Sequence, residues 1–189
     1  VSANNLLRDK IAFMKRVCHE WYKVYSETIR KYDPNHLIFG DRNTVHLQPL
    51  SDWAIHIMAP YIDVLSINVM GPQRIALKEM EIVTTNWDGP IHLADTGAGI
   101  YNGTYPKSTY MCKDINEFED VYSGIVRLGI EHPQVIGLGW CGYFETRSSR
   151  SGLVDAITNT PDEAKIDVVK KWNKWAESQT ASVRQEANT

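Results

Sequence analysis

Short apolar runs alternate with longer amphipathic segments along this chain, and this alternation limits the possible folds more than any other feature. Four runs are typical of buried strands, at residues 36–40, 62–67, 91–94 and 135–139. Segments with helical spacing of apolar residues lie between them. Because short, continuously apolar strands that alternate with helices form helix-covered parallel sheets, the sequence predicts an α/β fold with a parallel sheet of about four strands.

Helical periodicity is clearest before the first run. Residues 5–32 carry apolar side chains at helical spacing, and Asp33-Pro34 ends this helix because proline disfavours the α conformation of the residue before it. A later helix begins with Asp114 and Glu117 at the spacing of a capping box. The other helices are expected over residues 50–59, 72–87, 114–130 and 161–178.

Chain length and helix ends define the expected domain. A (β/α)₈ barrel typically has roughly 250 residues, and about 200 at the least, whereas this chain has 189. We expect one domain over residues 1–180, made of a leading helix and four strand–helix units. A disordered polar tail is expected over residues 181–189.

Charge and cysteine content argue against several functions. The formal net charge is −3, and no cluster of Lys and Arg is typical of nucleic-acid binding. No apolar run approaches the roughly 18 residues of a membrane span. The three cysteines, Cys18, Cys112 and Cys141, lack metal-ligand spacing, and their odd number argues against a disulfide framework. We therefore expect no metal, cofactor, nucleic-acid or membrane partner.

The first residues do not define a compartment. Residues 1–10 are polar and lack the apolar core of a signal peptide. The location is therefore left open, and a secreted or periplasmic location requires a signal further upstream.

Loops on the two sides of the predicted sheet differ in kind. Connections leading into the strands are tight turns rich in proline, whereas the loops that follow the strands are long, polar and aromatic. The latter begin at Asp41, Asn68, Asp95 and Trp140. Since the carboxyl ends of parallel strands carry the function in α/β folds, we expect the functional site at this edge.

Five segments resemble known enzymes. YSETIRKYDPNHLIFGDR at 25–42 is similar to the helix and fifth strand of agarase-like and β-galactosidase-like glycoside hydrolases, a (β/α)₈ clan with retaining chemistry and two catalytic glutamates. IDVLSINVMG at 62–71 resembles the sixth strand, PIHLAD at 90–95 the seventh, and VIGLGWCGYFE at 135–145 the eighth. GLVD at 152–155 resembles the run before the final helix. The resemblance implies half of a (β/α)₈ barrel, from the fifth strand to the eighth.

Individual roles follow from this resemblance. Asp95 occupies the position of the nucleophile, and Trp140 that of a tryptophan that stacks on sugar rings. Arg42 and Asn68 end the fifth and sixth strands and face the same cleft. Glu145 and Tyr143, just beyond Trp140, are further candidates for contact with an oligosaccharide.

Each candidate also has a purely structural interpretation. Asp95 could cap a turn, Trp140 could pack in the core, and Arg42 could form a structural salt bridge. Asn68 could form a hydrogen bond to a partner in a buried turn. Glu145 could be a solvent-exposed acidic residue of a loop. Tyr143 could cover an apolar rim, and the histidines are best explained as structural.

The chain departs from the family in three ways. The nucleophile position holds Asp95, which is one methylene shorter than glutamate. The sixth strand ends in Asn68-Val69-Met70, where the family tends to place a tyrosine. No segment matches the fourth strand with its Asn-Glu pair, so the acid/base group is missing. Retaining chemistry needs two carboxyl groups about 5–5.5 Å apart.

Three functions remain possible. The chain could be the C-terminal half of a polysaccharide-degrading glycosidase, inactive without its N-terminal barrel half. It could instead be a non-catalytic half-barrel that pairs with a second copy to cover its edges, with residual carbohydrate binding or no activity. A flavodoxin-like binding domain is the third possibility, but the sequence has no phosphate loop.

Overall fold

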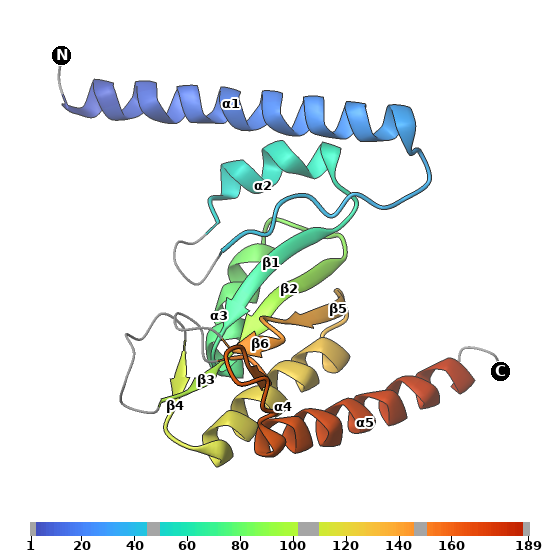
Figure 1. Ribbon diagram of the computed structural model, residues 1–189. Helices are drawn as coiled ribbons and strands as arrows, with labels where there is room; N and C mark the ends of the chain where they lie inside the picture. Colours follow the sequence, from blue (N-terminus) through green and yellow to red (C-terminus); the bar gives the residue numbers. More distant parts are fainter. Residues whose placement is uncertain (1–2, 45–49, 102–109, 146–150, 187–189) are drawn as a thin grey trace.

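A three-stranded parallel sheet forms the centre of the molecule in this computed structural model, which describes residues 3–44, 50–101, 110–145 and 151–186 (Figure 1). The strands are β1 (Leu65–Met70), β2 (Ile91–Gly97) and β5 (Val135–Trp140), in the order β1-β2-β5. Both neighbouring pairs are parallel. The predicted α/β class and strand direction agree with this arrangement, but the number of strands does not.

The first predicted strand, residues 36–40, was wrong as a regular strand. This segment nevertheless lies beside the start of β1, because the Asp63 and Val64 N–H groups donate to the Ile38 carbonyl at 2.8 and 3.2 Å. A single parallel bridge joins Asn43 to Ile67 further along. Between the two contacts Gly40 has a φ of +67°, outside the β region, so the extended backbone is interrupted.

The described residues form six helical segments. They are α1 (Ala3–Tyr32), α2 (Asp52–Met58), the 3₁₀ turn η1 (Ala59–Tyr61), α3 (Gln73–Thr84), α4 (Ile115–Glu131) and α5 (Glu163–Glu186). Helix α5 passes the boundary expected at residue 180, so the tail predicted to be disordered is helical up to Glu186. Among the described residues, no helix is long and apolar enough to cross a membrane.

The start of α4 shows how local sequence determines a helix end. Asp114 is the N-cap, and its carboxylate accepts a hydrogen bond from the Glu117 N–H at 3.0 Å. The Glu117 carboxylate accepts from the Lys113 N–H at 2.8 Å. In a capping box this second bond comes from the N-cap residue itself. The predicted capping box therefore differs from the usual one in its second hydrogen bond, which comes from the residue before the N-cap.

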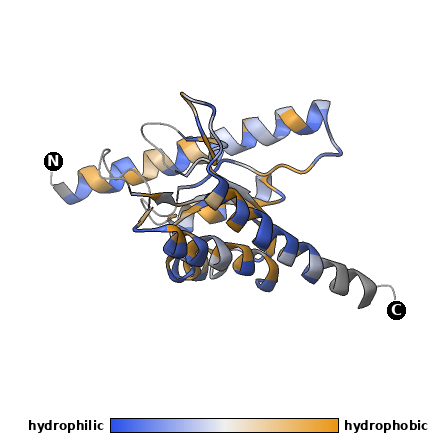
Figure 2. Cartoon of the chain, turned by 60° about the horizontal axis from the view of Figure 1, so that its bottom comes forward, coloured by the Kyte–Doolittle hydropathy of each residue, from blue (hydrophilic) through white to orange (hydrophobic). Residues whose placement is uncertain are grey.

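Helices α3 and α4 pack on the strands, α5 packs on α4, and α1 lies on α2 and η1 (Figure 1). Buried residues of β1 and β2, among them Leu65, Ile67 and Leu93, meet Met80 of α3 in the main core. A second cluster joins α4 to α5. Hydrophobic residues recur along α1 as well (Figure 2), yet much of this helix is exposed, including Phe13 at 67%.

The loops after β2 and β5 contain short parallel pairs. In the first loop β3 (Gly99–Ile100) pairs with β4 (Met111–Cys112). In the second loop β6 (Phe144–Glu145) pairs with β7 (Val154–Asp155). These pairs anchor the ends of both loops above the carboxyl edge of the sheet, where the sequence predicted irregular loops.

Two glycines on β5 provide a test of the sheet. A Cβ on Gly139 would lie 2.9 Å from the Ala94 carbonyl oxygen on β2, whereas a Cβ on Gly137 would make an ordinary 3.5 Å contact with His92. We expect Gly139→Ala to lower the free energy of unfolding by about 1–3 kcal/mol, because backbone atoms must move apart. Gly137→Ala is the matched control, with a change below about 1 kcal/mol in urea denaturation. Equal effects would contradict the close approach of β2 and β5.

Candidate functional site

Asp95 lies near the carboxyl end of β2, where the strand is irregular. In the β1–β2 register Ile67 pairs with Leu93 and Asn68 pairs with Asp95, so Ala94 is an extra residue on β2. Such a bulge changes the direction of the side chain that follows it. The Asp95 side chain is 18% exposed. It is thus partly accessible at the edge of the sheet where function was expected.

Two side chains from neighbouring segments converge on one oxygen of Asp95. The Asn68 Nδ2 atom at the end of β1 lies 3.4 Å from Asp95 Oδ2. The Arg42 guanidinium lies 3.8 Å from the same oxygen, and its side chain is 64% exposed. The structure therefore brings together three of the predicted site residues, from three adjacent segments. The long Arg42 contact leaves the guanidinium able to reach a ligand.

A fourth member of this cluster, Cys141, was missed by the sequence reasoning. Its side chain lies close enough to Asp95 for the carboxylate to act on the thiol. Burial, followed by the neighbouring Asp95, raises the pKa of Cys141 to about 11, although Arg42 and Ser151 act in the opposite direction. The thiol is therefore protonated at neutral pH. Its position directly after Trp140 at a strand end was the available signal.

Trp140 does not face this cluster. Its ring packs edge-to-face against Phe118 and Tyr122 of α4, with ring centroids 5.6 and 4.9 Å away. The indole N–H donates to the Ser151 carbonyl at 2.8 Å. Successive residues of a strand point to opposite faces, so Cys141 lies on the Asp95 side of the sheet while Trp140 enters the helix-side core. This geometry favours core packing over the sugar-stacking role that the resemblance implies.

In the described part of the chain, Glu145 has a partner outside the Asp95 cluster, and Tyr143 is exposed to solvent. The Glu145 carboxylate accepts from the Lys165 ammonium at 2.9 Å, and Lys165 also contacts Asp162 at 3.4 Å. The Lys165 side chain is only 3% exposed. The carboxylate of Glu145 is thus engaged in fixing the β6–β7 loop to α5. Tyr143 is 66% exposed and remains accessible to a ligand.

The chemistry of the cluster is that of one carboxylate surrounded by donors. Asp95 can accept hydrogen bonds from hydroxyl groups, and Arg42 and Asn68 can donate to them. In the described part of the chain, no group of three His, Cys, Asp or Glu side chains could hold a metal ion. Burial lowers the pKa of His92, on β2 three residues before Asp95, which favours its neutral form.

Comparisons with known proteins support this architecture at the level of structure. The sequence matches no protein-family description and no curated protein. The solved structure of an exo-β-agarase is similar with a TM-score of 0.71 at 20% identity, covering 95% of this chain and 25% of the agarase. The agarase AgWH50C gives 0.76 at 17% identity, covering 95% and 28%. The chain spans about a quarter of the length of these agarases.

Enzymes of a second group are similar as well. A β-glucuronidase from an uncultured Clostridium sp. has a TM-score of 0.57 at 15% identity, with 82% of this chain and 29% of that chain covered. A GH2 β-galacturonidase from Eisenbergiella tayi has a TM-score of 0.58 at 14% identity, with 82% and 30% covered. At these identities the likeness concerns the fold. The chain therefore has a glycoside-hydrolase-like fold, which agrees in part with the resemblance found in the sequence.

The buried Lys165–Glu145 pair can be tested against an exposed pair. Lys165→Ala removes the ammonium from a Glu145 side chain that is 11% exposed, and we expect a loss of about 3–5 kcal/mol in the free energy of unfolding. Lys171, whose side chain is 64% exposed, pairs with Glu119 and is the control. Lys171→Ala should cost less than about 1 kcal/mol. Similar midpoints for both variants in urea denaturation would show that the buried pair does not hold the loop.

Proposed function

We propose that this chain is the C-terminal half of a glycoside hydrolase that acts on an agarase-type or galactosidase-type polysaccharide, and that it is inactive alone. The convergence of Arg42 and Asn68 on Asp95 carries the proposal. This cluster lies at the carboxyl end of a parallel sheet, which is the end that bears the active site in (β/α)₈ enzymes. Asp95 is the residue proposed to contact the sugar, at the position of the nucleophile.

The need for a second half follows from the number of carboxylates. Hydrolysis with retention requires an acid/base group in addition to a nucleophile. Among the described residues of this cluster, Asp95 is the one that carries a carboxylate. The Glu145 carboxylate lies elsewhere and pairs with Lys165. Another part of the barrel would have to supply the acid/base carboxyl group. The shorter side chain of Asp95 also sets its carboxylate back from the position of a glutamate.

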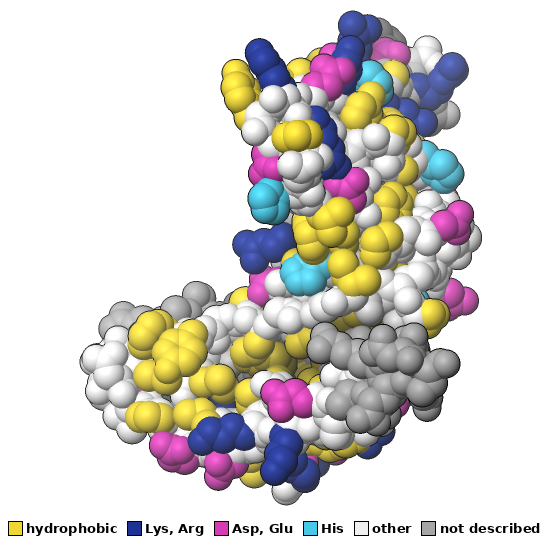
Figure 3. Space-filling model, turned by 90° about the vertical axis from the view of Figure 1, so that its right-hand side faces the viewer, with side chains coloured by type: hydrophobic (Ala, Val, Ile, Leu, Met, Phe, Trp, Pro, Cys, Tyr) yellow, Lys and Arg dark blue, Asp and Glu magenta, His cyan; other side chains and the backbone are white. Residues whose placement is uncertain are grey.

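Surfaces left uncovered in this chain support a missing partner. β5 is at the end of the sheet order, and Ile136 on it is 54% exposed. Hydrophobic side chains are exposed on this side of the molecule and in the hollow between its upper and lower parts (Figure 3). Monomeric proteins rarely leave such apolar surface and a strand edge open to water. A barrel half that adds a strand beside β5 would cover both.

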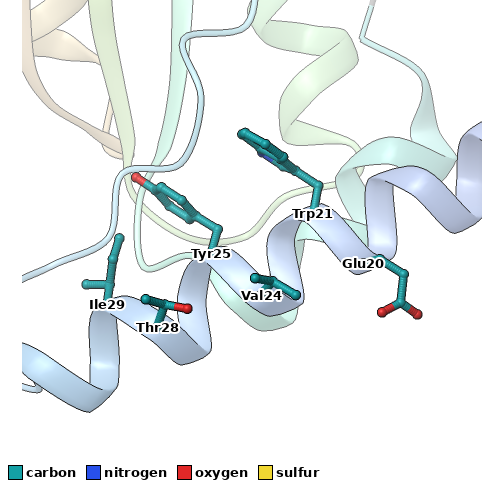
Figure 4. A pocket seen from close by; sticks show the side chains of 6 residues that line it. All are labelled: Glu20, Trp21, Val24, Tyr25, Thr28 and Ile29. Carbon is teal, nitrogen blue, oxygen red and sulfur yellow. The ribbon is translucent and has the colours of Figure 1, made fainter.

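The exposed face of α1 is a second uncovered surface. A shallow depression there is lined by Trp21, Val24, Tyr25, Ile29 and two polar neighbours, all from α1 (Figure 4). The ring of Trp21 stacks on that of Tyr25 at 6.5 Å, and Trp21 is 57% exposed. A depression with walls from one helix is an open helix face rather than a ligand cavity. Packing against further helices of a barrel would bury it.

Self-association is the second candidate function. Two copies could place β5 of one beside the 38–43 segment of the other, and so cover both edges around a twofold axis. The exposed Ile136 and the position of β5 at the end of the sheet order of the described strands favour this arrangement. The protein would then be a non-catalytic carbohydrate-binding assembly or lack activity.

The primary proposal predicts a weak sugar site centred on Asp95. We expect oligosaccharides derived from agarose to shift the NMR signals of Arg42, Asn68 and Asp95, with no hydrolysis of agarose by the chain alone. Asp95→Asn should weaken binding by about 10-fold or more, because a hydrogen bond to a charged group is worth about 1.5–3 kcal/mol. Asp120→Asn, at an exposed residue of α4, is the control. Equal binding by both variants would rule Asp95 out.

The self-association alternative predicts a defined mass. Sedimentation should then give twice the 21.5 kDa of the chain. A charge introduced at the strand edge by Ile136→Lys should shift the protein to single chains. Ile157→Lys, at a residue 77% exposed in the turn after β7, should leave the mass unchanged. A single-chain mass at every concentration would exclude this alternative.

A further inference from the structure

Asn43 lies beside β1, and it forms hydrogen bonds through both its backbone and its side chain. Its N–H donates to the Ser66 carbonyl at 3.1 Å, and its carbonyl accepts from the Asn68 N–H at 2.7 Å. Its side-chain Nδ2 donates to the Asp41 carbonyl at 2.9 Å and to the Ser66 carbonyl at 3.1 Å. Carbonyl oxygens only accept hydrogen bonds, so the nitrogen of the amide has to face both partners. The amide thus joins the chain to β1 and closes the backbone around Arg42.

Asp41, on the other side of Arg42, is tied to helix α1. Its carboxylate oxygen Oδ2 accepts from the Trp21 indole N–H at 3.2 Å and from the Tyr22 hydroxyl at 3.0 Å. Tyr22 is buried in the main core, so the position of this donor is fixed. The backbone of Arg42 therefore lies between two anchored residues, one bound to α1 and the other bound to β1.

Arg42 needs this support because its own contact with Asp95 is weak. Its guanidinium lies 3.8 Å from Asp95 Oδ2, and its side chain is 64% exposed. An ion pair that is open to water contributes little, and a long side chain loses rotamer freedom when it is held in one place. The direction of the guanidinium therefore has to come from the backbone that carries it.

We propose that Asn43 is a positioning residue, whose side-chain amide fixes the backbone around Arg42 and so holds the guanidinium beside Asp95, where a sugar hydroxyl would bind. This inference rests on the proposed function, because it assumes that Arg42 and Asp95 contact the sugar. The hydrogen bond from Asn68 goes to the main chain of Asn43, so a variant without the amide can retain it. Loss of the amide should therefore act on Arg42 and spare Asn68.

Backbone relaxation measured by NMR tests the role of the amide without any ligand. The wild-type chain should give an order parameter of about 0.85 at the Arg42 N–H, as a rigid backbone does, and Asn43→Ala should lower it toward about 0.6. Asn86→Ala is the matched control, because the Asn86 amide also donates twice, to the Ile82 carbonyl and the Asp52 carboxylate, both at 3.3 Å. The control should leave the order parameter of Arg42 unchanged. The same value in Asn43→Ala and in the wild-type chain would overturn the proposal.

A double-mutant cycle tests whether Asn43 acts through Arg42. We expect Asn43→Ala to weaken the binding of oligosaccharides derived from agarose about 3–10-fold, because the guanidinium must then be ordered when the sugar binds. In a chain that already carries Arg42→Ala, the same substitution should change binding by less than about twofold, since a residue that acts through another adds nothing once its partner is gone. Asn43→Ser retains one donor, which cannot bridge two carbonyls, and should cause a smaller loss in the same direction.

Equal losses from Asn43→Ala with and without the Arg42 side chain would indicate a general effect on the fold and reject the positioning role. If the wild-type chain binds no oligosaccharide, the proposed function fails, and the order parameter of Arg42 still decides whether the Asn43 amide holds the backbone.

Discussion

Parallel pairing of β1, β2 and β5 is the constraint on which the rest of the molecule depends. It places the carboxyl ends of three strands at one edge, so residues far apart in the sequence, such as Arg42 and Asn68, reach the same carboxylate. The strands can approach this closely because residue 139 is glycine. The Ala94 carbonyl of the neighbouring strand leaves no room for a side chain at Gly139. The extra residue Ala94 on β2 then turns Asp95 toward its neighbours.

Two adjacent residues at the end of β5 point to opposite faces of the sheet, one into the core and one toward the candidate site. Trp140 joins Phe118 and Tyr122 in the core below α4, and Cys141 faces Asp95. The pleat of a strand imposes this division, since a side chain cannot serve both faces. A similar division separates the two acidic candidates. Glu145 is bound to the buried Lys165 and stabilises the loop, whereas Asp95 retains partial exposure.

Burial patterns were easier to predict from the sequence than pairing. The apolar runs at β1, β2 and β5 and the cap at Asp114 were found because they depend on nearby residues. Ile38 is buried as predicted, but its segment does not form a regular strand, because the backbone of Gly40 turns out of the β region. Strand ends alone indicated Asn68 and Asp95 as candidates, whereas Arg42 was named from the family resemblance. The direction of Trp140 depends on the packing of α4, which no local pattern encodes.

The sheet has two unlike margins, and this asymmetry has a consequence for assembly. On one side lies β5, which pairs with a strand only on its β2 side among the described residues, and on the other lies the 38–43 segment beside β1. If β5 of one molecule binds the 38–43 segment of the next, each molecule that joins the assembly exposes a new β5 edge. The assembly then closes into a ring if its curvature brings the last molecule next to the first, and otherwise it grows as an open filament. The twist between β1, β2 and β5 would therefore decide between a closed ring and a fibre.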